Sequence, residues 1–473
     1  MKFFSSHKQY LVTKMIACLA FFGAGILFCM LSCQPTSDNK KIKFITLDPG
    51  HFHAALVQKT MYPDVDTTVY IYSTEGEDLK LHLNRIKGYN SRTDNPTNWD
   101  QVVYMGSDFM EKMIAEKKGN VVVLSGNNEK KTDYILQSLQ NGFHVLADKP
   151  MVIDADGFEK LKQAFETAEK NKVVLYDIMT ERFEINTILQ KELSQVPEIF
   201  GTLENGTSDN PAITKESVHH FYKMVSGSAL TRPAWFLDTR QQGEGIVDVM
   251  THLVDLVQWE CFPEQTIDYK NDITVTSAKR WATPLSLSQF KTITKQDSFP
   301  NYLKQAATDS ILNIFCNGEI NYTLKDVHAK TVVIWNYQAP EGTGDTHSSL
   351  MRGTKANLII RQGKEEGYKP VLYIEPIQNN PAFETTLIES FKKISAKFKG
   401  IELEKSSAGW SVTIPNELKE DHEAHFGRVT KNFLQYVNNN NLPSWEVPNM
   451  LAKYYTTIQG LEMAKKNDSI TPY

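Results

Sequence analysis

Two kinds of hydrophobic pattern divide the chain at about residue 178. In the first part, short segments that are apolar throughout alternate with stretches whose apolar residues recur at helical spacing. The pattern predicts strands at 41–47, 68–72, 120–124, 144–147 and 173–176, and helices at 108–117, 130–140 and 158–170. Continuously apolar strands alternating with helices form a parallel sheet that is covered on both faces. We therefore predict an α/β, doubly wound domain over residues 41–178, with its ligand at the carboxyl ends of the strands.

The second part of the chain, residues 179–473, has a different pattern. Several of its predicted strands alternate apolar and polar residues, and these strands lie at 273–277, 319–324, 331–337, 356–361 and 371–374. Such alternation is typical of a mixed or antiparallel sheet with one solvated face. Helices are expected at 417–437 and 447–465. We predict a C-terminal α+β domain with a large mixed or antiparallel sheet.

The first 33 residues have the pattern of a lipoprotein signal peptide. Lys2, Lys8 and Lys14 precede an apolar segment that ends at Ser32-Cys33. The segment is short for a membrane span, and the residues before Cys33 resemble a bacterial lipobox. We expect a lipid on Cys33, a linker over 34–40, and attachment to the bacterial cell envelope facing the periplasm. A plain signal peptide and a membrane anchor are the alternatives.

Composition limits the partners. The 473 residues carry a net charge of −5 from interspersed acidic and basic side chains. Nucleic-acid-binding domains usually have a basic face, so no nucleic-acid partner is expected. Besides Cys33, only Cys261 and Cys316 would remain after cleavage, and neither a disulfide framework nor a CxxC metal spacing is present.

Candidate chemistry is concentrated at Gly243-Glu244-Gly245 and the helical pattern that follows. Asp248 and His252 are four residues apart, which on a helix places both side chains on one face. Lys149 follows the predicted strand 144–147 about a hundred residues earlier. Together they indicate a Lys, Asp and His site.

The turn after the first predicted strand is where a dinucleotide-binding fold carries its GxGxxG fingerprint. Gly50 can serve as the second glycine, but Asp48 and His53 stand at the other two glycine positions. An Asp is unfavourable beside a pyrophosphate, so Asp48 either turns away or the turn binds something else. Glu75, after strand 68–72, is the candidate for the ribose, and the absence of a following Arg favours NAD over NADP.

Several of these segments resemble the Gfo/Idh/MocA oxidoreductases. The resemblance lies in Asp148-Lys149-Pro150, Glu181-Arg182-Phe183, the segment from Gly243 to His252, and Gly353-Thr354-Lys355. Segments 217–222 and 232–236 are similar to the branch with a putative oxidoreductase C-terminal domain found in Bacteroidetes-type lipoproteins. Three departures are Asp148 in place of Glu, the broken glycine fingerprint, and Ser125-Gly-Asn-Asn128 in place of the usual Thr-Pro-Asn.

The resemblance implies a Rossmann-like first domain and hydride transfer at a nicotinamide. His252 is the expected base, Asp248 orients it or holds a substrate hydroxyl, and Lys149 stabilises the developing alkoxide. The expected cofactor-binding residues are Gly50, His51, Phe52, Glu75, Ser125, Asn127, Asn128, Asp148 and Lys149. The expected substrate-binding residues are Arg182, His219, His220, Tyr222, Arg232, Trp235 and Asp238, a set suited to stacking on and hydrogen bonding to a sugar, although a loop of packed aromatic residues is an equal alternative. No metal site is predicted.

These observations lead to an NAD(P)-dependent oxidoreductase acting on a secondary hydroxyl of a sugar or glycoside, with C3 as the hypothesis. A protein exported unfolded arrives without NAD, so the cofactor should be held tightly and restored within each cycle. One rival is an NAD-dependent enzyme that cleaves a glycoside with no net redox change. The other is a carbohydrate-binding lipoprotein without catalysis. A homo-oligomer through the C-terminal sheet is left open.

Overall fold

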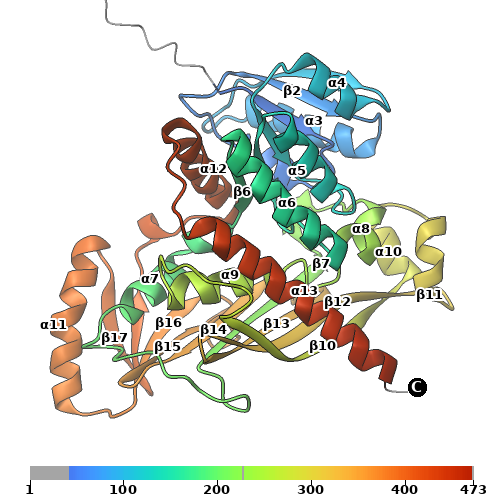
Figure 1. The fold of residues 1–473 in the computed structure, drawn as a ribbon. Helices are drawn as coiled ribbons and strands as arrows, with labels where there is room; N and C mark the ends of the chain where they lie inside the picture. Colours follow the sequence, from blue (N-terminus) through green and yellow to red (C-terminus); the bar gives the residue numbers. More distant parts are fainter. Residues whose placement is uncertain (1–41, 226–227, 471–473) are drawn as a thin grey trace, which may run out of the picture. The chain divides into compact units, whose positions relative to one another are not determined.

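The computed structural model describes residues 42–225 and 228–470. A six-stranded parallel sheet with strand order β3-β2-β1-β4-β5-β6 forms the first part of the fold (Figure 1). Its strands are β1 (Phe44–Leu47), β2 (Thr68–Ser73), β3 (Asp100–Met105), β4 (Val121–Leu124), β5 (His144–Asp148) and β6 (Leu175–Ile178). Its helices are α2 (His53–Leu56), α3 (Glu77–Ser91), α4 (Phe109–Glu116), α5 (Lys131–Gln140) and α6 (Ala155–Asn171). The order reverses between β1 and β4, which is the switch point of a doubly wound sheet.

The predicted α/β fold is confirmed, and the differences have physical causes. Strands β1, β4 and β6 are buried at every position, as expected for strands covered on both faces. Strand β3, which the apolar pattern did not predict, lies at the edge of the sheet and has no fully buried residue. Helix α3 was also missed because only Leu79, His82 and Ile86 are buried along its 15 residues.

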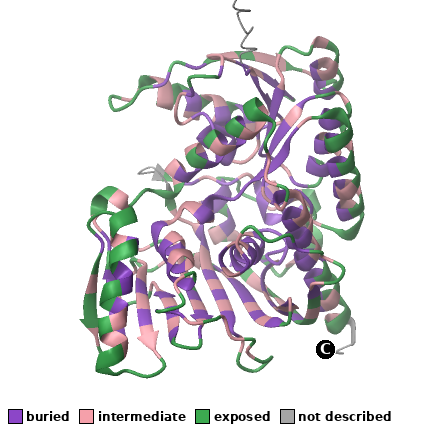
Figure 2. Ribbon diagram, turned by 60° about the vertical axis from the view of Figure 1, so that its left-hand side comes forward, coloured by how far each residue is buried: buried purple, intermediate pink, exposed green. Residues whose placement is uncertain are grey.

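A ten-stranded mixed sheet forms the second part, with order β10-β12-β13-β7-β14-β15-β16-β18-β17 and β11 beside β12. Its strands are β7 (Ile213–Tyr222), β10 (Ile273–Ser286), β11 (Ala307–Thr308), β12 (Ile311–Leu324), β13 (Val327–Gln338), β14 (Thr346–Arg352), β15 (Ala356–Arg361), β16 (Val371–Pro376), β17 (Glu402–Ser406) and β18 (Gly409–Thr413). Only β7 and β13 pair in parallel, and the remaining pairs are antiparallel. Buried and more exposed residues alternate along these strands (Figure 2), which confirms the predicted sheet with one covered face.

Helices join the parallel sheet and part of the ten-stranded sheet into one hydrophobic core, and a second core lies at β15, β16 and β18. The helices of the second part include α7 (Ile185–Ser194), α9 (Met250–Cys261), α11 (Pro381–Lys397), α12 (His422–Asn439) and α13 (Glu446–Ile470). α7 and α9 pack on the ten-stranded sheet. α12 contacts β5 and β6 of the parallel sheet, and α13 lies against α6, α9 and β10 (Figure 1). The last two helices therefore close the boundary between the sheets, beside the carboxyl ends of β5 and β6.

The predicted signal peptide, the lipidated Cys33 and the linker lie outside the described residues. Across the described part of the chain, no helix combines the length and the apolar character that a membrane span requires.

Candidate active site

Tight packing of the turn at 243–245 positions the Asp and His of the site. Gly243 has a φ of +94°, a conformation that favours glycine. A Cβ on Gly245 would lie 1.8 Å from the carbonyl oxygen of Cys316 on β12, so only glycine allows this approach. Glu244 is fixed by an ion pair with Arg280 at 2.7 Å. The turn therefore anchors the start of α9 to the ten-stranded sheet.

Lys149 and Asp248 form a buried ion pair between the two parts of the fold. Lys149 Nζ lies 2.6 Å from Asp248 Oδ1, and the side chains are 9% and 6% exposed. Gln242 Nε2 donates to the other Asp248 oxygen at 3.1 Å. Burial raises the pKa of Asp248, but the Lys149 ammonium more than offsets this effect, and the pKa lies below its usual value. The ion pair joins the end of β5 to the turn before α9.

His252 lies in the first turn of α9, but it does not meet Asp248 as predicted. The helix begins at Met250, so Asp248 precedes it and its carboxylate faces Lys149. Among the described residues, His252 Nδ1 is buried with no hydrogen-bond partner. Burial and the Lys149 charge together lower the pKa of His252 to about 4, although the Glu181 carboxylate opposes both effects. His252 is thus a neutral imidazole with one free nitrogen.

His252 lines a polar cavity of about 470 Å³ on the covered side of the ten-stranded sheet. We call it the substrate pocket. Its walls come from α7, α9, β7, β14 and the start of α12, and its polar side chains include Glu181, Glu184, Ser217, His219, Lys223, Asp345, His347, Gln362, Lys419 and His422. A cavity of this size with converging polar groups of both charges suits a small polar molecule with several hydroxyl groups.

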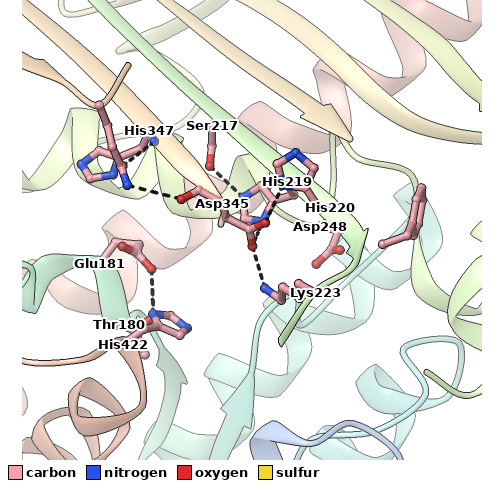
Figure 3. Close-up of polar contacts among 12 residues, drawn as sticks. Thr180, Glu181, Ser217, His219, His220, Lys223, Asp248, Asp345, His347 and His422 are labelled. Carbon is pink, nitrogen blue, oxygen red and sulfur yellow. Dashed lines mark hydrogen bonds and ion pairs between the residues drawn. The ribbon is translucent and has the colours of Figure 1, made fainter. Parts of the chain in front are cut away.

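Asp345 is the centre of a polar cluster in the substrate pocket (Figure 3). Its carboxylate contacts Lys223 at 2.6 Å, His220 at 3.1 Å and His219 at 3.2 Å. Ser217 Oγ lies 2.7 Å from the other nitrogen of His219. Burial raises the pKa of Asp345, but the neighbouring His219 and Lys223 hold it well below the usual value. The cluster fixes the ring of His219 at the wall of the pocket.

A second acid–base pair lies in the same pocket. His422 Nδ1, on α12, is 3.2 Å from Glu181 Oε1. Burial raises the pKa of Glu181, but His422 and the other nearby histidines hold it well below its usual value. His252 lines the same pocket as this pair, and the Glu181 carboxylate acts on it by opposing the fall of its pKa.

Sequence reasoning missed Glu181, Asp345, His347 and His422. Asp345, His347 and Ser349 are spaced two apart, which is the pattern of one face of a strand, and they lie at and just before β14 beside β7. His422 and His425 are three apart on α12, on one side of a helix. Both periodic signals were present, but neither shows that the two segments meet.

Arg182, expected to bind substrate, instead belongs to a buried ion cluster. Its guanidinium donates to Asp255 at 2.7 Å and to Glu446 at 3.0 Å. Lys453 adds contacts of 2.7 Å to Asp177 and 2.9 Å to Asp255. These charges are paired with one another and hold α13 to β6 and α9. The neighbouring Glu181 is the residue of this segment that lines the pocket.

The other expected substrate residues are divided between the pocket and its surroundings. His219 lines it, and His220 stands behind it on Asp345. Tyr222 stacks near Tyr337, with ring centroids 6.3 Å apart. Arg232 is buried and donates to the carbonyl oxygens of Phe221 and His220, while Asp238 is paired with Arg240. Trp235 lies on the parallel sheet, away from the substrate pocket.

The turn after β1 makes its hydrogen bonds to other parts of the protein, and we call this arrangement closed. The backbone N–H groups of Gly50 and His51 both donate to the carbonyl oxygen of Ser125, each at 3.2 Å. Asp48 has a φ of +45°, and its carboxylate accepts hydrogen bonds from Ser73 at 3.4 Å and Tyr134 at 3.3 Å. Burial raises the pKa of Asp48. The turn thus keeps its conformation without a ligand.

Trp235 covers this turn. A Cβ on Gly50 would lie 3.0 Å from Trp235 Cζ2, and Trp235 Nε1 donates to Asp78 Oδ2 at 2.8 Å. Beside it is a cavity of about 300 Å³ at the carboxyl end of β2, lined by Asp48, Ser73, Thr74, Asp78, Trp235 and Tyr302. Glu75, the expected ribose partner, is exposed at its edge.

The remaining expected cofactor residues lie at the carboxyl ends of β1, β4 and β5. Ser125 Oγ donates to Asp148 at 2.9 Å, and Asp148 also contacts His53. Asn127 and Asn128 bond to Gln241 and Gln242 of α8 (Thr239–Gln242), so they tie the parallel sheet to the segment before the glycine turn. Phe52 packs partly buried against the core.

The fold combines a doubly wound parallel sheet with a large mixed sheet. At their boundary lie the Lys149–Asp248 ion pair and the neutral His252. Two family profiles match the chain: "Oxidoreductase family, NAD-binding Rossmann fold" over residues 68–177 and "Putative oxidoreductase C terminal domain" over residues 189–465. The chain belongs to the Gfo/Idh/MocA family, in the branch with this C-terminal domain.

Solved structures agree with this assignment. A "putative oxidoreductase" from Parabacteroides merdae ATCC 43184 is 53% identical and has a TM-score of 0.88, covering 90% of this chain and 98% of that one. A "putative myo-inositol dehydrogenase" from Sinorhizobium meliloti 1021 shares the fold at 11% identity, with a TM-score of 0.52 over 90% and 98% of the two chains. A 3-ketoreductase from Actinomadura kijaniata does so at 12% identity, with a TM-score of 0.54 over 89% and 97%. A search of curated proteins gives no match.

The family implies a dinucleotide, but the turn in this structure does not fit a pyrophosphate. A dinucleotide-binding turn presents free N–H groups and an uncovered glycine to the phosphates. Here the N–H groups of Gly50 and His51 are used by Ser125, the glycine is covered by Trp235, and the carboxylates of Asp48 and Asp78 lie beside it. The turn must therefore rearrange before a dinucleotide can bind there.

Proposed function

We propose that the protein is an oxidoreductase that acts on a secondary hydroxyl group of a sugar or glycoside held in the substrate pocket. The observation that carries the proposal is the position of His252, a neutral imidazole that lines a cavity with several polar side chains while the Lys149–Asp248 pair lies close by. Family membership supports the reaction class. The 3-ketoreductase and inositol dehydrogenase relatives support the fold alone.

The proton of the reacting hydroxyl is the part of the reaction that these residues can handle. The neutral imidazole of His252, which lines the substrate pocket, accepts this proton, because an alcohol that loses hydride must also lose its hydroxyl proton. The Lys149 ammonium, held in a water-poor boundary, stabilises the alkoxide that develops during the transfer. Asp248 holds that ammonium in place. His219, Asp345 and Lys223 offer donors and acceptors to the remaining hydroxyls.

We propose NAD as the hydride acceptor, tightly bound, and C3 as the position oxidised. The family description and the absence of an Arg after Glu75 favour NAD over NADP. Because the turn after β1 is closed, binding of NAD requires Trp235 to move away from Gly50. The hydrogen bonds from the N–H groups of Gly50 and His51 to the Ser125 carbonyl oxygen must also break.

Replacing Trp235 by Ala should therefore increase the affinity for NAD by at least about tenfold, because the indole no longer has to be displaced. Adding Asp78→Asn should increase it further, since the freed carboxylate repels phosphate. The measurement is calorimetric titration of the protein with NAD. Trp281→Ala, which removes an indole that is 38% exposed on β10, is the control and should leave the affinity unchanged. An unaltered affinity in the Trp235 variants would show that this side chain is not the barrier.

The Glu181–His422 pair favours a second candidate function. Glycoside cleavage requires one group to remove a proton and another to protonate the leaving oxygen. His252 and the Glu181–His422 pair place two such acid–base groups in one pocket. An enzyme of this kind would break a glycosidic bond with no net change in redox state.

The location of the protein is also proposed from the sequence. We propose that Cys33 carries a lipid and that the mature chain faces the periplasm from the cell envelope. The carbohydrate substrates would then come from glycans in that compartment.

The test is product analysis with glucose and glucosides that carry deuterium at C3. The proposal expects a keto-sugar that has lost the deuterium, detected by mass spectrometry. Cleaved glycoside without a keto-sugar supports the second candidate. Binding of the sugar without any product would overturn both enzyme functions and leave a carbohydrate-binding lipoprotein.

A further inference from the structure

His51, His53 and Asp148 form a cluster that the hydride chemistry does not use. The two histidines are separated by one residue in the turn after β1, and Asp148 is the last residue of β5. Asp148 Oδ2 lies 3.0 Å from His53 Nδ1 and 3.5 Å from His51 Nδ1. The two imidazole rings are edge to face with centroids 4.0 Å apart. Each residue can offer one ligand atom so that all three lie within 4.8 Å of one another.

These separations match the spacing of atoms around one small metal ion. Imidazole nitrogens and carboxylate oxygens bind zinc at about 2.0–2.2 Å, so neighbouring ligands in a tetrahedron lie roughly 3.3–3.6 Å apart. The contacts of 3.0 and 3.5 Å are close to that value. A small relaxation of the side chains would complete the arrangement.

Two atoms of the cluster that lack a hydrogen-bond partner also favour a metal site. Among the described residues, His51 Nδ1 and Asp148 Oδ1 are buried polar atoms with no hydrogen-bond partner. The Asp148 side chain is 4% exposed and that of His51 is 13% exposed. An unsatisfied buried polar group is costly, so most such groups in proteins have a partner. A cation bound by His51 Nδ1 and by both oxygens of Asp148 would give each of these atoms a partner.

We propose that His51, His53 and Asp148 bind a divalent transition-metal ion of the zinc type. Two imidazoles and one carboxylate are a common ligand set for such ions. The fourth position is left to the hydroxyl of Ser125 or to a water molecule. The site goes beyond the proposed oxidoreductase function and does not depend on it.

The surroundings hold the ligands in place. Ser125 Oγ donates to Asp148 Oδ2 at 2.9 Å, and Lys131 Nζ donates to the carbonyl oxygens of Asp148 and Pro150 at 3.0 and 3.2 Å. The ring of His51 is stacked on Phe236 at 6.0 Å with an angle of 13°. Such outer contacts orient the ligands of metal sites and are part of their design.

The charges around the site decide which metal it would select. Lys131, Lys149 and Arg232 are nearby cations, and Lys149 is paired with the Asp248 carboxylate. A single ligand carboxylate in this setting cannot hold a hard cation by charge alone. Mg²⁺ and Ca²⁺ prefer several oxygen ligands, whereas Zn²⁺ and Co²⁺ bind imidazole well. We therefore expect Zn²⁺ or Co²⁺ and no response to Mg²⁺.

Bound metal would hold the turn after β1 against the end of β5, one residue before Lys149. It would fix the place from which the Lys149 ammonium extends.

The experiment uses untagged protein, freed of metal with a chelator, dialysed and loaded with Zn²⁺ or Co²⁺. Mass spectrometry of the metal should find about one Zn²⁺ per chain, and Co²⁺ should give the visible absorption of a four- or five-coordinate site. His51→Ala and Asp148→Asn should each lower the bound metal at least about tenfold, while His328→Ala, which removes a half-buried imidazole on β13, should leave it unchanged.

Circular dichroism of each variant establishes that it is folded, and His53→Gln replaces His51→Ala if the latter is not. Metal that stays at one per chain in the cluster variants would place the ion elsewhere and overturn the proposal, as would the absence of bound Zn²⁺ and Co²⁺ in the unaltered protein. Because metal content is measured without turnover, failure here leaves the proposed oxidation of a sugar standing. Failure of the sugar assay likewise leaves the metal site standing.

Discussion

Replacing Lys149 by Met should lower kcat/KM for the sugar by about 10²–10³, the usual effect of removing one preorganised group that stabilises a developing oxyanion. The ammonium is 2.6 Å from Asp248 in a boundary that excludes most water, so its charge acts strongly on a neighbouring alkoxide. Sugar binding should change less than kcat, because the alkoxide that Lys149 stabilises forms only during the transfer. Steady-state kinetics and calorimetric titration with the sugar separate the two effects.

The Lys149 variant needs two controls. Removing one member of a buried ion pair leaves the other charge unpaired and costs about 3–5 kcal/mol of stability. The double variant Lys149→Met, Asp248→Asn removes both charges, so it should recover stability but not activity. Lys160→Met breaks a Lys–Asp pair of the same 2.6 Å length on the surface, with Asp133, and should leave kcat/KM unchanged. Full activity in a folded Lys149 variant would exclude the proposed role.

The parallel sheet was predictable because its strands are buried on both faces. Apolar runs such as that of β4 have no other simple explanation in a chain of this composition. β7 was not predicted as a strand, since it carries a buried Lys215 and two histidines. Lys215 is satisfied by Glu260 of α9 at 2.8 Å, a partner 45 residues away that no local pattern reveals. The polar residues of β7 that line the pocket therefore interrupt the apolar pattern by which the strand could have been predicted.

The site was predictable only where its residues are close in sequence or belong to a known motif. The segment from Gly243 to His252 and the Lys149 motif pointed to the boundary of the two domains. Asp345, Glu181 and His422 come from three distant segments that meet because β14 pairs with β7 and α12 returns to the parallel sheet. That meeting is a property of the topology. It also explains why Asp248 pairs with Lys149 across the boundary and not with His252 on its own segment.

His252→Ala should lower kcat by about 10²–10⁴, the range expected for the loss of a positioned general base. The pH dependence identifies the group. Burial and the Lys149 charge lower the pKa of His252 to about 4, so the imidazole is neutral and able to accept a proton at every pH above that value. Activity should be level above about pH 5 and fall tenfold per unit below pH 4. An unperturbed histidine would lose activity already below about pH 6.5.

Glu181→Gln provides the sharper test of this assignment. The Glu181 carboxylate raises the pKa of His252, so removing its charge should move the acid limb of kcat/KM to lower pH. His328→Ala, on β13 but outside the lining of the substrate pocket, should leave the limb in place. The buried neutral histidines take up protons when the chain unfolds, so the stability of the fold decreases as the pH falls from about 6.5 towards 4. Unfolding must therefore be measured at each pH. A limb near pH 6.5 that persists in the His252 variant would assign the base to another group, with the Glu181–His422 pair as the first to examine.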